Sequence, residues 1–404
     1  APAGDPPMGV SRMILAHSTK RATRRLEVAP AAAVVAAPTE PAERPHPHPR
    51  RLALINDQPY VGGLVWHLGY LAHWLQEQGW EARFYFDGDR GCGGNTLLPW
   101  LSAQGITWRM HEGRGAYDDW LRSELREFGP GTVLLGWKMP EPVAAIAGPW
   151  RRVLLFGGSA ARNLVTPELA ACLDGILGVS EAMRACVPER GRHLYQTVFA
   201  GLPTGDLERC REERERHRAA LGIPADATVV LWAGRLVSHG KRPDLLRALI
   251  ERHPELHWLV CGAYSASAAG TRREWDALAR SRTNLTLQWK MRPWEMASAF
   301  GASDLYVHTS DAEGLSTSTM EALAAGLPVL TTDCHGQREL IRDGEGGWIV
   351  PCGDLPALDR RLREILAMPA AAREGAARRG QAETLARCSL PVYGRRFAAA
   401  LEGR

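Results

Sequence analysis

The stretch that most constrains the fold of this chain is residues 303–332, SDLYVHTSDAEGLSTSTMEALAAGLPVLTT. Its pattern predicts a strand at Leu305–His308, followed by a loop and a short helix. Residues 316–319 supply hydroxyls that can cap the start of the helix, and Gly326 with Pro328 ends it before a second strand. A strand–helix–strand unit this short is typical of a doubly wound parallel sheet, whose ligands bind at the carboxyl ends of the strands.

Two glutamates, Glu313 and Glu321, frame the loop and the start of this helix, with seven residues between them. A helix N-terminus attracts phosphate, because unpaired N–H groups and the positive end of the helix dipole coincide there. A nucleotide diphosphate could therefore rest on the backbone of Gly314, Leu315, Ser316 and Thr317. Glu313 could then reach sugar hydroxyls and Glu321 the ribose. For two isolated glutamates, the favoured interpretation would be that Glu313 is an ordinary loop carboxylate and Glu321 an ordinary glutamate at a helix start.

Three segments resemble glycosyltransferase family 4, whose members have the GT-B fold. The longest, EGLSTSTMEALAAGLPVLTTDCHGQRELIRDGEGGWIV, resembles the E-x7-E donor-site motif of the family. The other two are WAGRLVSHGKRPDLLRAL, similar to its Gly-Arg and lysine segment, and YVGGLVWHLGYLAHWLQEQGW, similar to its Gly-Gly loop and first helix. Together they cover most of residues 52–351 in the order of the family.

The resemblance implies an α/β protein of the GT-B class, with two Rossmann-like domains facing across a cleft and a C-terminal helix crossing back to the first. It also implies a retaining glycosyltransferase, in which the acceptor hydroxyl attacks from the front face and the leaving phosphate serves as base. The donor is a nucleotide-diphosphate sugar, with no metal or other cofactor. Two alternatives remain: a non-catalytic partner or binding subunit on the same fold, and a sugar phosphorylase or epimerase.

Two cations are expected beside the diphosphate. Arg235 ends a predicted strand and can bind phosphate bidentately, whereas Lys241 would act as a point charge. Lys241 follows Arg235 one residue later than the family pattern places its lysine, so Arg242 is the alternative for that role. The resemblance implies that Arg235 and Lys241 neutralise the diphosphate as the glycosidic bond breaks, while Glu313 positions the donor sugar. The competing interpretation is a surface arginine and lysine at a helix start.

Two further segments are expected near the donor. Gly62 and Gly63 follow the first predicted strand, and glycines there permit positive φ angles and a close approach of the backbone to a ligand. Alone, such a pair is more often a plain turn. The resemblance places Lys290 and Met291 near the nucleotide base.

The acceptor side departs from the family, whose members often carry a histidine after the strand that ends here at Leu135. This chain has GWKMPEP there, with Trp137 and Lys138. Trp66 and Trp137 follow strand-end loops, and indole rings stack on sugar faces. We therefore take Trp66, Trp137 and Lys138 as acceptor candidates, and expect a soluble saccharide or small molecule rather than a membrane lipid. A buried indole and a surface lysine are the competing interpretations.

Composition narrows the class of protein. A chain of 404 residues can form two cores, and its net charge of +4 is not clustered as in nucleic-acid binders. No apolar run approaches the roughly 20 residues of a membrane helix. The eight cysteines are scattered without a C-x-x-C pair, as expected for reduced thiols in a cytoplasmic protein. Asp87 and Asp89 have D-x-D spacing, but they lie in a Gly-rich turn and are not expected to bind a metal.

Four regions follow from these patterns. We expect a flexible Ala/Pro-rich tail at 1–50, an acceptor-side domain at 51–205, a donor-binding domain at 206–382 and a returning helix at 383–404. The charged run at 206–218 is expected to be a solvated helix face. Ser180 is expected to cap a helix.

Overall fold

The computed structural model describes residues 49–56, 63–88, 97–113, 116–136, 148–157, 165–236, 240–263 and 269–403. These ranges belong to one compact unit, which spans 46–404. The expected tail, apart from its last two residues, lies outside the described residues, as do Gly62, Trp137 and Lys138. None of the helices within the described ranges is both long and apolar enough to cross a membrane.

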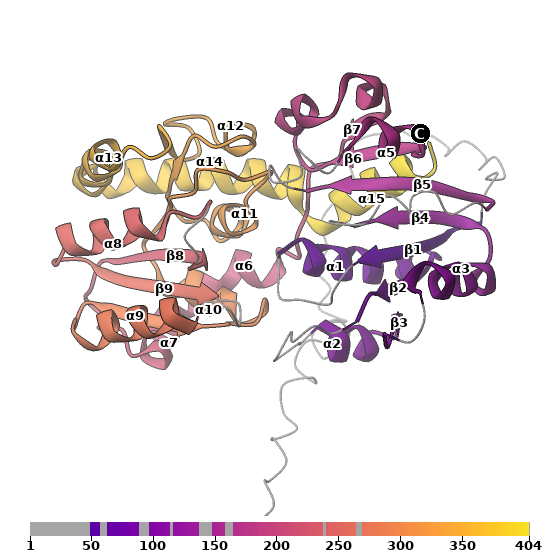
Figure 1. The fold of residues 1–404 in the computed structure, drawn as a ribbon. Coiled ribbons are helices and arrows are strands. Elements are labelled where there is room, and N and C mark those ends of the chain that lie inside the picture. The colour runs from indigo at the N-terminus through magenta and orange to yellow at the C-terminus, as the bar shows by residue number, and fades with distance from the viewer. Residues whose placement is uncertain are drawn as a thin grey trace, which may run out of the picture. The chain divides into compact units, whose positions relative to one another are not determined.

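The first half of the chain forms a seven-stranded parallel sheet in the order β3-β2-β1-β4-β5-β6-β7 (Figure 1). Its strands are β1 (Arg51–Asn56), β2 (Glu81–Phe86), β3 (Thr107–Met110), β4 (Gly131–Leu135), β5 (Trp150–Phe156), β6 (Gly175–Gly178) and β7 (Tyr195–Thr197). The strand order reverses beside β1, because β1 pairs with both β2 and β4. This reversal is the feature that creates a ligand-binding edge in doubly wound sheets.

Helices cover both faces of this sheet, and successive residues of β1 point into different cores. Leu52 and Leu54 pack with apolar residues of α1 (Gly63–Glu77), whereas Ala53 and Ile55 pack with those of α3 (Tyr117–Phe128). A parallel strand buried on both faces reads as a continuous apolar run, as β1 does. The other helices within the described residues of this half are α2 (Leu97–Ala103), α5 (Pro167–Ala171) and the 3₁₀ helices η2 (Glu181–Cys186) and η3 (Glu189–Leu194).

The second half forms a six-stranded parallel sheet in the order β10-β9-β8-β11-β12-β13. Its strands are β8 (Val229–Arg235), β9 (His257–Ala263), β10 (Leu285–Trp289), β11 (Leu305–His308), β12 (Val329–Thr332) and β13 (Trp348–Val350). Here the order reverses between β8 and β11, so a second ligand-binding edge is expected at the carboxyl ends of these two strands. The fold is therefore α/β with two Rossmann-like sheets, as the sequence predicted.

Helices also cover both faces of the second sheet. Those within the described residues are α6 (Gly205–Arg209), η4 (Cys210–Glu213), α7 (Arg214–Leu221), α8 (Pro243–Arg252), α9 (Ala269–Arg280), α10 (Met296–Ala302), α11 (Thr317–Ala324), α12 (Gln337–Leu340), α13 (Leu355–Ala367) and α14 (Ala370–Cys388). A further helix, α15 (Leu390–Leu401), follows α14. Leu231 and Tyr306 pack with α10 and α11 on one face, whereas Val230 and Trp232 pack with α8 and α13 on the other.

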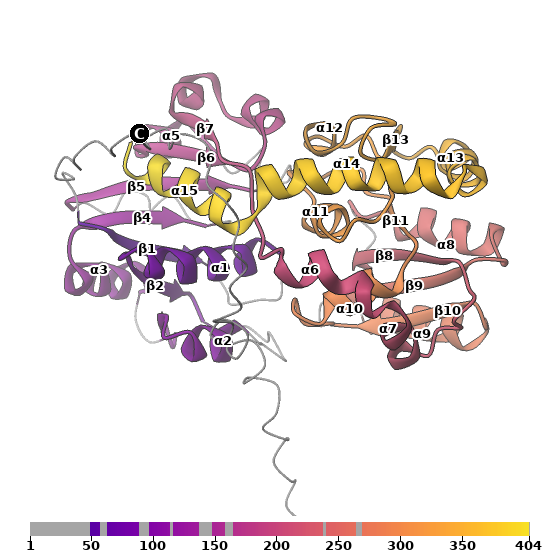
Figure 2. The ribbon, with the colours of Figure 1, turned by 180° about the vertical axis from the view of Figure 1, so that it is seen from behind.

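The last helix packs against the first sheet domain. Tyr393 and Phe397 of α15 share a core with Leu68 and Leu71 of α1, and Gly394 lies against the indole of Trp74. Figure 2 shows α14 and α15 as consecutive helices, in yellow. Since α14 continues through residue 383, the returning helix is α15 and begins at Leu390.

The charged run at 206–218 is not a purely solvated face, and this corrects the sequence-based expectation. Arg218 of α7 is 1% exposed, and its guanidinium donates to the carbonyl oxygens of Ala302 and Ala227 at 2.9 and 2.8 Å and to Asp304 at 2.7 Å. Asp304 also accepts from Val229 N at 2.8 Å. One arginine of the run therefore joins α7, α10 and the start of β8.

Candidate active site

The start of α11 has the caps that the sequence predicts. Ser316 precedes the helix in an extended conformation, and its hydroxyl accepts from Thr319 N at 3.3 Å. Gly326 has a φ of +69° just beyond the C-terminal end, a conformation that glycine adopts without strain. The loop 309–316 thus connects β11 to the N-terminus of α11, beside the reversal between β8 and β11.

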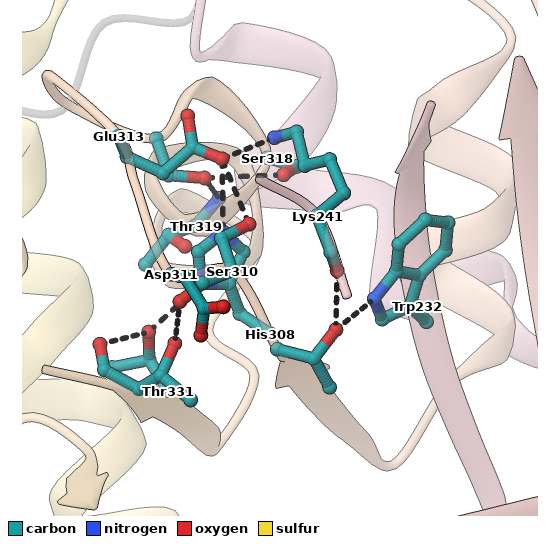
Figure 3. A network of polar contacts seen from close by, with 12 residues as sticks. Trp232, Lys241, His308, Ser310, Asp311, Glu313, Ser318, Thr319 and Thr331 are labelled. Carbon is teal, nitrogen blue, oxygen red and sulfur yellow. Dashed lines mark hydrogen bonds and ion pairs between the residues drawn. The ribbon is translucent and has the colours of Figure 1, made fainter. Parts of the chain in front are cut away.

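Glu313 is held in this loop by several donors on a single oxygen (Figure 3). Lys241 Nζ pairs with Glu313 Oε1, Ser310 Oγ donates to the same oxygen at 2.9 Å, and His308 Nε2 lies 3.4 Å from it. Burial alone would raise the pKa of this carboxyl, but the charges and hydrogen bonds of Lys241 and His308 hold it well below its usual range. Glu313 is therefore a partly buried, ionised carboxylate whose Oε1 already faces three donors.

The two expected cations have different environments. Arg235 ends β8 and is exposed, and its guanidinium makes no hydrogen bond or ion pair with any described residue. Lys241 is paired with Glu313, and its carbonyl accepts from Thr309 Oγ1 at 2.8 Å, which in turn accepts from Trp232 Nε1 at 3.0 Å. The structure brings Lys241, rather than Arg242, to the loop carboxylate.

Arg242 is engaged elsewhere. Its guanidinium binds Asp244 at 2.7 Å and Asp311 at 3.0 Å. These two hydrogen bonds raise the pKa of Arg242 beyond its ordinary value, since they stabilise the charged form. Because both terminal nitrogens of its guanidinium are bound to carboxylates, Arg242 is less available to a ligand than Arg235.

The carboxyl group of Glu321 has no partner among the described residues. It lies in α11, is partly buried, and forms no hydrogen bond or ion pair through its side chain to any residue in the described ranges. Burial raises its pKa to about 8. Met291, expected near the base, has its Sδ 3.4 Å from Cys261 Sγ, and the Glu321 charge adds to the burial that raises the pKa of Cys261 to about 12. Glu321, Met291 and Cys261 therefore lie close to one another.

The Gly314 end of the loop is fixed by Ser180 of the first sheet domain and by Gly336 of the second. Ser180 Oγ donates to Gly314 O at 3.0 Å, and a Cβ on Gly336 would collide with the same carbonyl. Ser180 was expected to cap the following helix, but its side chain makes no capping bond. The Glu339 carboxylate of α12 accepts from Glu181 N and Ala182 N at 2.8 Å instead. The expected role of Ser180 is therefore wrong, because the cap comes from a residue distant in sequence.

Thr317, the first residue of α11, contacts two residues of α1. His67 Nε2 lies 3.0 Å from Thr317 Oγ1, and His67 Nδ1 lies 2.6 Å from Gly201 O. A Cβ on Gly63 would stand 2.8 Å from Thr317 Oγ1, which explains why glycine fits at the start of α1. Burial lowers the pKa of His67 to about 4, opposed by its bond to Gly201. The sequence analysis missed His67, whose only signal is a histidine among the buried positions of an apolar helix.

The structure corrects the expectation that Trp66 contacts an acceptor. Trp66 is 4% exposed, and its ring packs edge-on against Trp100 and Trp294 at centroid distances of 5.5 and 5.7 Å. Its position on the core face of α1, rather than in the preceding loop, accounts for this burial.

Asp87 lies 3.4 Å from His111, and no group of three or more His, Cys, Asp or Glu side chains in the described part of the chain could hold a metal ion.

The two parallel sheets, with their reversed strand orders and the returning helix, define an α/β protein of the GT-B class. Within it, residues 213–383 match the model of the family described as glycosyl transferases group 1. This range contains Arg235, Lys241, Glu313 and Glu321.

Curated relatives match the chain over part of its length. The D-inositol 3-phosphate glycosyltransferase of Streptomyces avermitilis is 33% identical over 259 residues, which cover 58% of this chain and 54% of that protein. The lipopolysaccharide core biosynthesis glycosyltransferase LpsE of Rhizobium meliloti is 33% identical over 155 residues, covering 37% of this chain and 43% of that protein. The chain thus spans about half the length of the curated relatives it matches.

Solved structures share the fold at low identity. A glycosyltransferase from Rickettsia africae has a TM-score of 0.73 at 14% identity, covering 87% of this chain and 98% of that one. Anabaena Alr3699/HepE, solved in complex with UDP and glucose, has a TM-score of 0.74 at 15% identity, covering 87% and 99%. These likenesses support the GT-B fold.

Proposed function

We propose that the protein is a retaining glycosyltransferase of family 4, which moves a sugar from a nucleotide-diphosphate sugar to a hydroxyl acceptor without a metal. The observation that carries this proposal is the set of charged groups around the start of α11. Arg235, Lys241 and Glu313 lie at the carboxyl ends of β8 and β11 or just beyond them, and these two strands are paired neighbours. A doubly wound sheet binds its ligand at this reversal.

The diphosphate of the donor rests on the N-terminus of α11, at Gly314, Leu315, Ser316 and Thr317. Helix N–H groups and the positive dipole end stabilise phosphate there. The exposed guanidinium of Arg235 binds the phosphate oxygens in a fork, and Lys241 adds a second positive charge. Together they stabilise the charge that develops on the leaving phosphate as the glycosidic bond breaks.

The two glutamates bind the remaining parts of the donor, the ribose and the transferred sugar. Glu321 accepts hydrogen bonds from the ribose hydroxyls, which would supply the partners that its carboxylate lacks in the unliganded protein. Glu313 presents its second oxygen to the hydroxyls of the sugar. The complex of HepE with UDP and glucose supports a uridine nucleotide as the first donor to test.

The acceptor is a soluble saccharide or another small polyhydroxylated molecule. The relative named D-inositol 3-phosphate glycosyltransferase supports an acceptor of this kind. Trp137 and Lys138, which lie outside the described residues, remain the candidates to contact it. In this proposal the acceptor hydroxyl attacks from the face that the nucleotide leaves, and the leaving phosphate takes its proton.

Incubation of the protein with UDP-glucose and a panel of inositol phosphates and monosaccharides tests this function. Mass spectrometry should detect a hexosylated acceptor in EDTA as well as in magnesium, and NMR of the anomeric carbon should show the configuration of the donor. An inverted product, or turnover that depends on the added metal, would contradict the mechanism. Donor binding without any turnover across the panel would favour a non-catalytic partner subunit.

A further inference from the structure

His308 is a buried histidine next to Glu313, and the proposed transfer chemistry does not use it. It is the last residue of β11 and is 1% exposed. Its Nδ1 lies 3.1 Å from Thr331 Oγ1 on the neighbouring strand β12. Its Nε2 lies 3.0 Å from Ser310 Oγ and 3.4 Å from Glu313 Oε1, so the ring bridges β12 and the carboxylate (Figure 3).

The hydrogen-bond partners determine which ring nitrogen carries the proton. Glu313 Oε1 can only accept, so the Ser310 hydroxyl donates its single proton to that oxygen at 2.9 Å. The Ser310 oxygen must then accept from His308 Nε2–H. His308 Nδ1 is left with a lone pair, and the Thr331 hydroxyl at 3.1 Å donates to it in preference to the Thr332 carbonyl oxygen at 3.3 Å. In the opposite tautomer, the lone pair of Nε2 would point at the Glu313 carboxylate. The single proton of the Ser310 hydroxyl would then have two acceptors, Nε2 and Glu313 Oε1.

This order of donors needs a neutral ring, and the surroundings of His308 provide one. Burial lowers the pKa of His308, although the nearby Glu313 carboxylate opposes the effect. The ring therefore donates one hydrogen bond toward Glu313 without adding a full charge to the site. Lys241 is the charged partner of the same oxygen.

We propose that His308 and Ser310 are positioning residues that keep the Glu313 carboxylate in place while Lys241 shares its charge with the donor diphosphate. This inference rests on the proposed function. In the unliganded protein, Lys241, Ser310 and His308 all face Oε1, and no hydrogen bond or ion pair reaches Oε2 from the described residues. When Lys241 turns toward phosphate, the chain from Thr331 through His308 and Ser310 still holds Oε1, so Oε2 stays directed at the sugar.

The tautomer of His308 is the first test, and it needs no ligand. Long-range ¹H–¹⁵N correlation spectra of protein labelled with ¹⁵N-histidine, compared with His308→Leu to identify the signals, report which nitrogen is protonated. At pH 7 the ring should be neutral with its proton on Nε2. A proton on Nδ1, or a doubly protonated ring, would overturn the chain of donors whether or not the protein is a glycosyltransferase.

Binding of UDP and UDP-glucose is the second test, because the proposed chain acts on the sugar and leaves the nucleotide untouched. By calorimetry, Ser310→Ala and His308→Leu should weaken UDP-glucose binding about tenfold while changing UDP binding less than twofold. Ser310→Thr, which keeps the hydroxyl, should restore UDP-glucose affinity. Equal losses for both ligands, or no loss for either, would show that the two residues are merely structural.

A matched control is His257 on β9, another buried strand histidine, whose Nε2 lies 2.9 Å from Thr286 Oγ1. Burial lowers its pKa as well, but it belongs to the opposite end of the sheet and faces no carboxylate of the site. His257→Leu should leave the affinities for UDP and UDP-glucose unchanged. If wild-type protein bound neither ligand, the proposed donor would be wrong, whereas the tautomer measurement would still decide whether the donor chain exists.

Discussion

His67 Nε2 and Thr317 Oγ1 lie 3.0 Å apart, although 250 residues of sequence separate them. His67 Nδ1 faces Gly201 O, which can only accept, so Nδ1 carries the ring proton and Nε2 accepts from the Thr317 hydroxyl. The first residue of the candidate phosphate-binding helix is therefore fixed by a buried, neutral histidine of α1.

Loss of this hydroxyl should destabilise the protein. Thr317→Val keeps the volume but leaves the buried Nε2 lone pair without a donor, and we expect a loss of about 1–3 kcal/mol in the free energy of unfolding. Thr317→Ser, which can still donate, should lose less than half as much. Urea unfolding followed by circular dichroism measures both variants. A Thr317→Val protein as stable as wild type would mean that the contact is not formed in solution.

Most of the strands and helices follow from local sequence. The strands β1, β11 and β12 are short runs rich in apolar or β-branched residues and bounded by turn residues, and α11 carries its own caps, so no distant contact is needed to predict them. The same holds for the placement of Arg235 at the end of a strand and of Glu313 in the loop before α11.

The residues that local sequence did not reveal depend on distant partners. Ser180 binds Gly314 O instead of capping η2, and Arg218 is buried because Asp304 and four carbonyl groups surround it. His67 has a role only because Thr317 meets it in the folded chain. Trp66 is a core residue because Trp100 and Trp294 enclose its ring, which no local pattern indicates.

Glu321 should make the unliganded protein less stable as the pH rises. Its folded-state pKa of about 8 lies above the unfolded value, so its contribution to stability is fully present below about pH 4.3 and is lost as the pH rises through 8. Glu321→Gln removes this dependence. Relative to wild type, it should gain about 3–4 kcal/mol of unfolding free energy between pH 5 and pH 8, since each unit of pKa difference is worth about 1.4 kcal/mol.

Thermal and urea unfolding of both proteins at the two pH values measures this gain. UDP at saturating concentration should narrow the difference at pH 8, because the ribose hydroxyls would supply partners to the wild-type carboxylate. A Glu321→Gln protein whose stability tracks that of wild type at every pH would show that the carboxylate is already solvated or paired.

The buried pair of Arg218 and Asp304 should be costly to break. Arg218→Met removes the guanidinium and leaves several carbonyl groups without a donor, whereas Asp304 keeps Arg214 and Val229 N, so we expect a loss of about 1–3 kcal/mol. Arg216→Met is the matched control, since Arg216 pairs with Glu213 on the exposed side of α7 and should change stability by less than about 1 kcal/mol. Equal losses in the two variants would refute the structural role assigned to Arg218.

Isothermal calorimetry with UDP tests the central claim, that the charged groups around α11 form a nucleotide-binding site. Wild type should bind, whereas Arg235→Ala and Glu321→Ala should each lose about tenfold to a hundredfold in affinity, the effect of one charge-assisted hydrogen bond. Arg378→Ala, which removes an exposed charge on α14, should bind as wild type does. Circular dichroism should show all four proteins folded. Wild-type affinity in both site variants would contradict the assignment of this site.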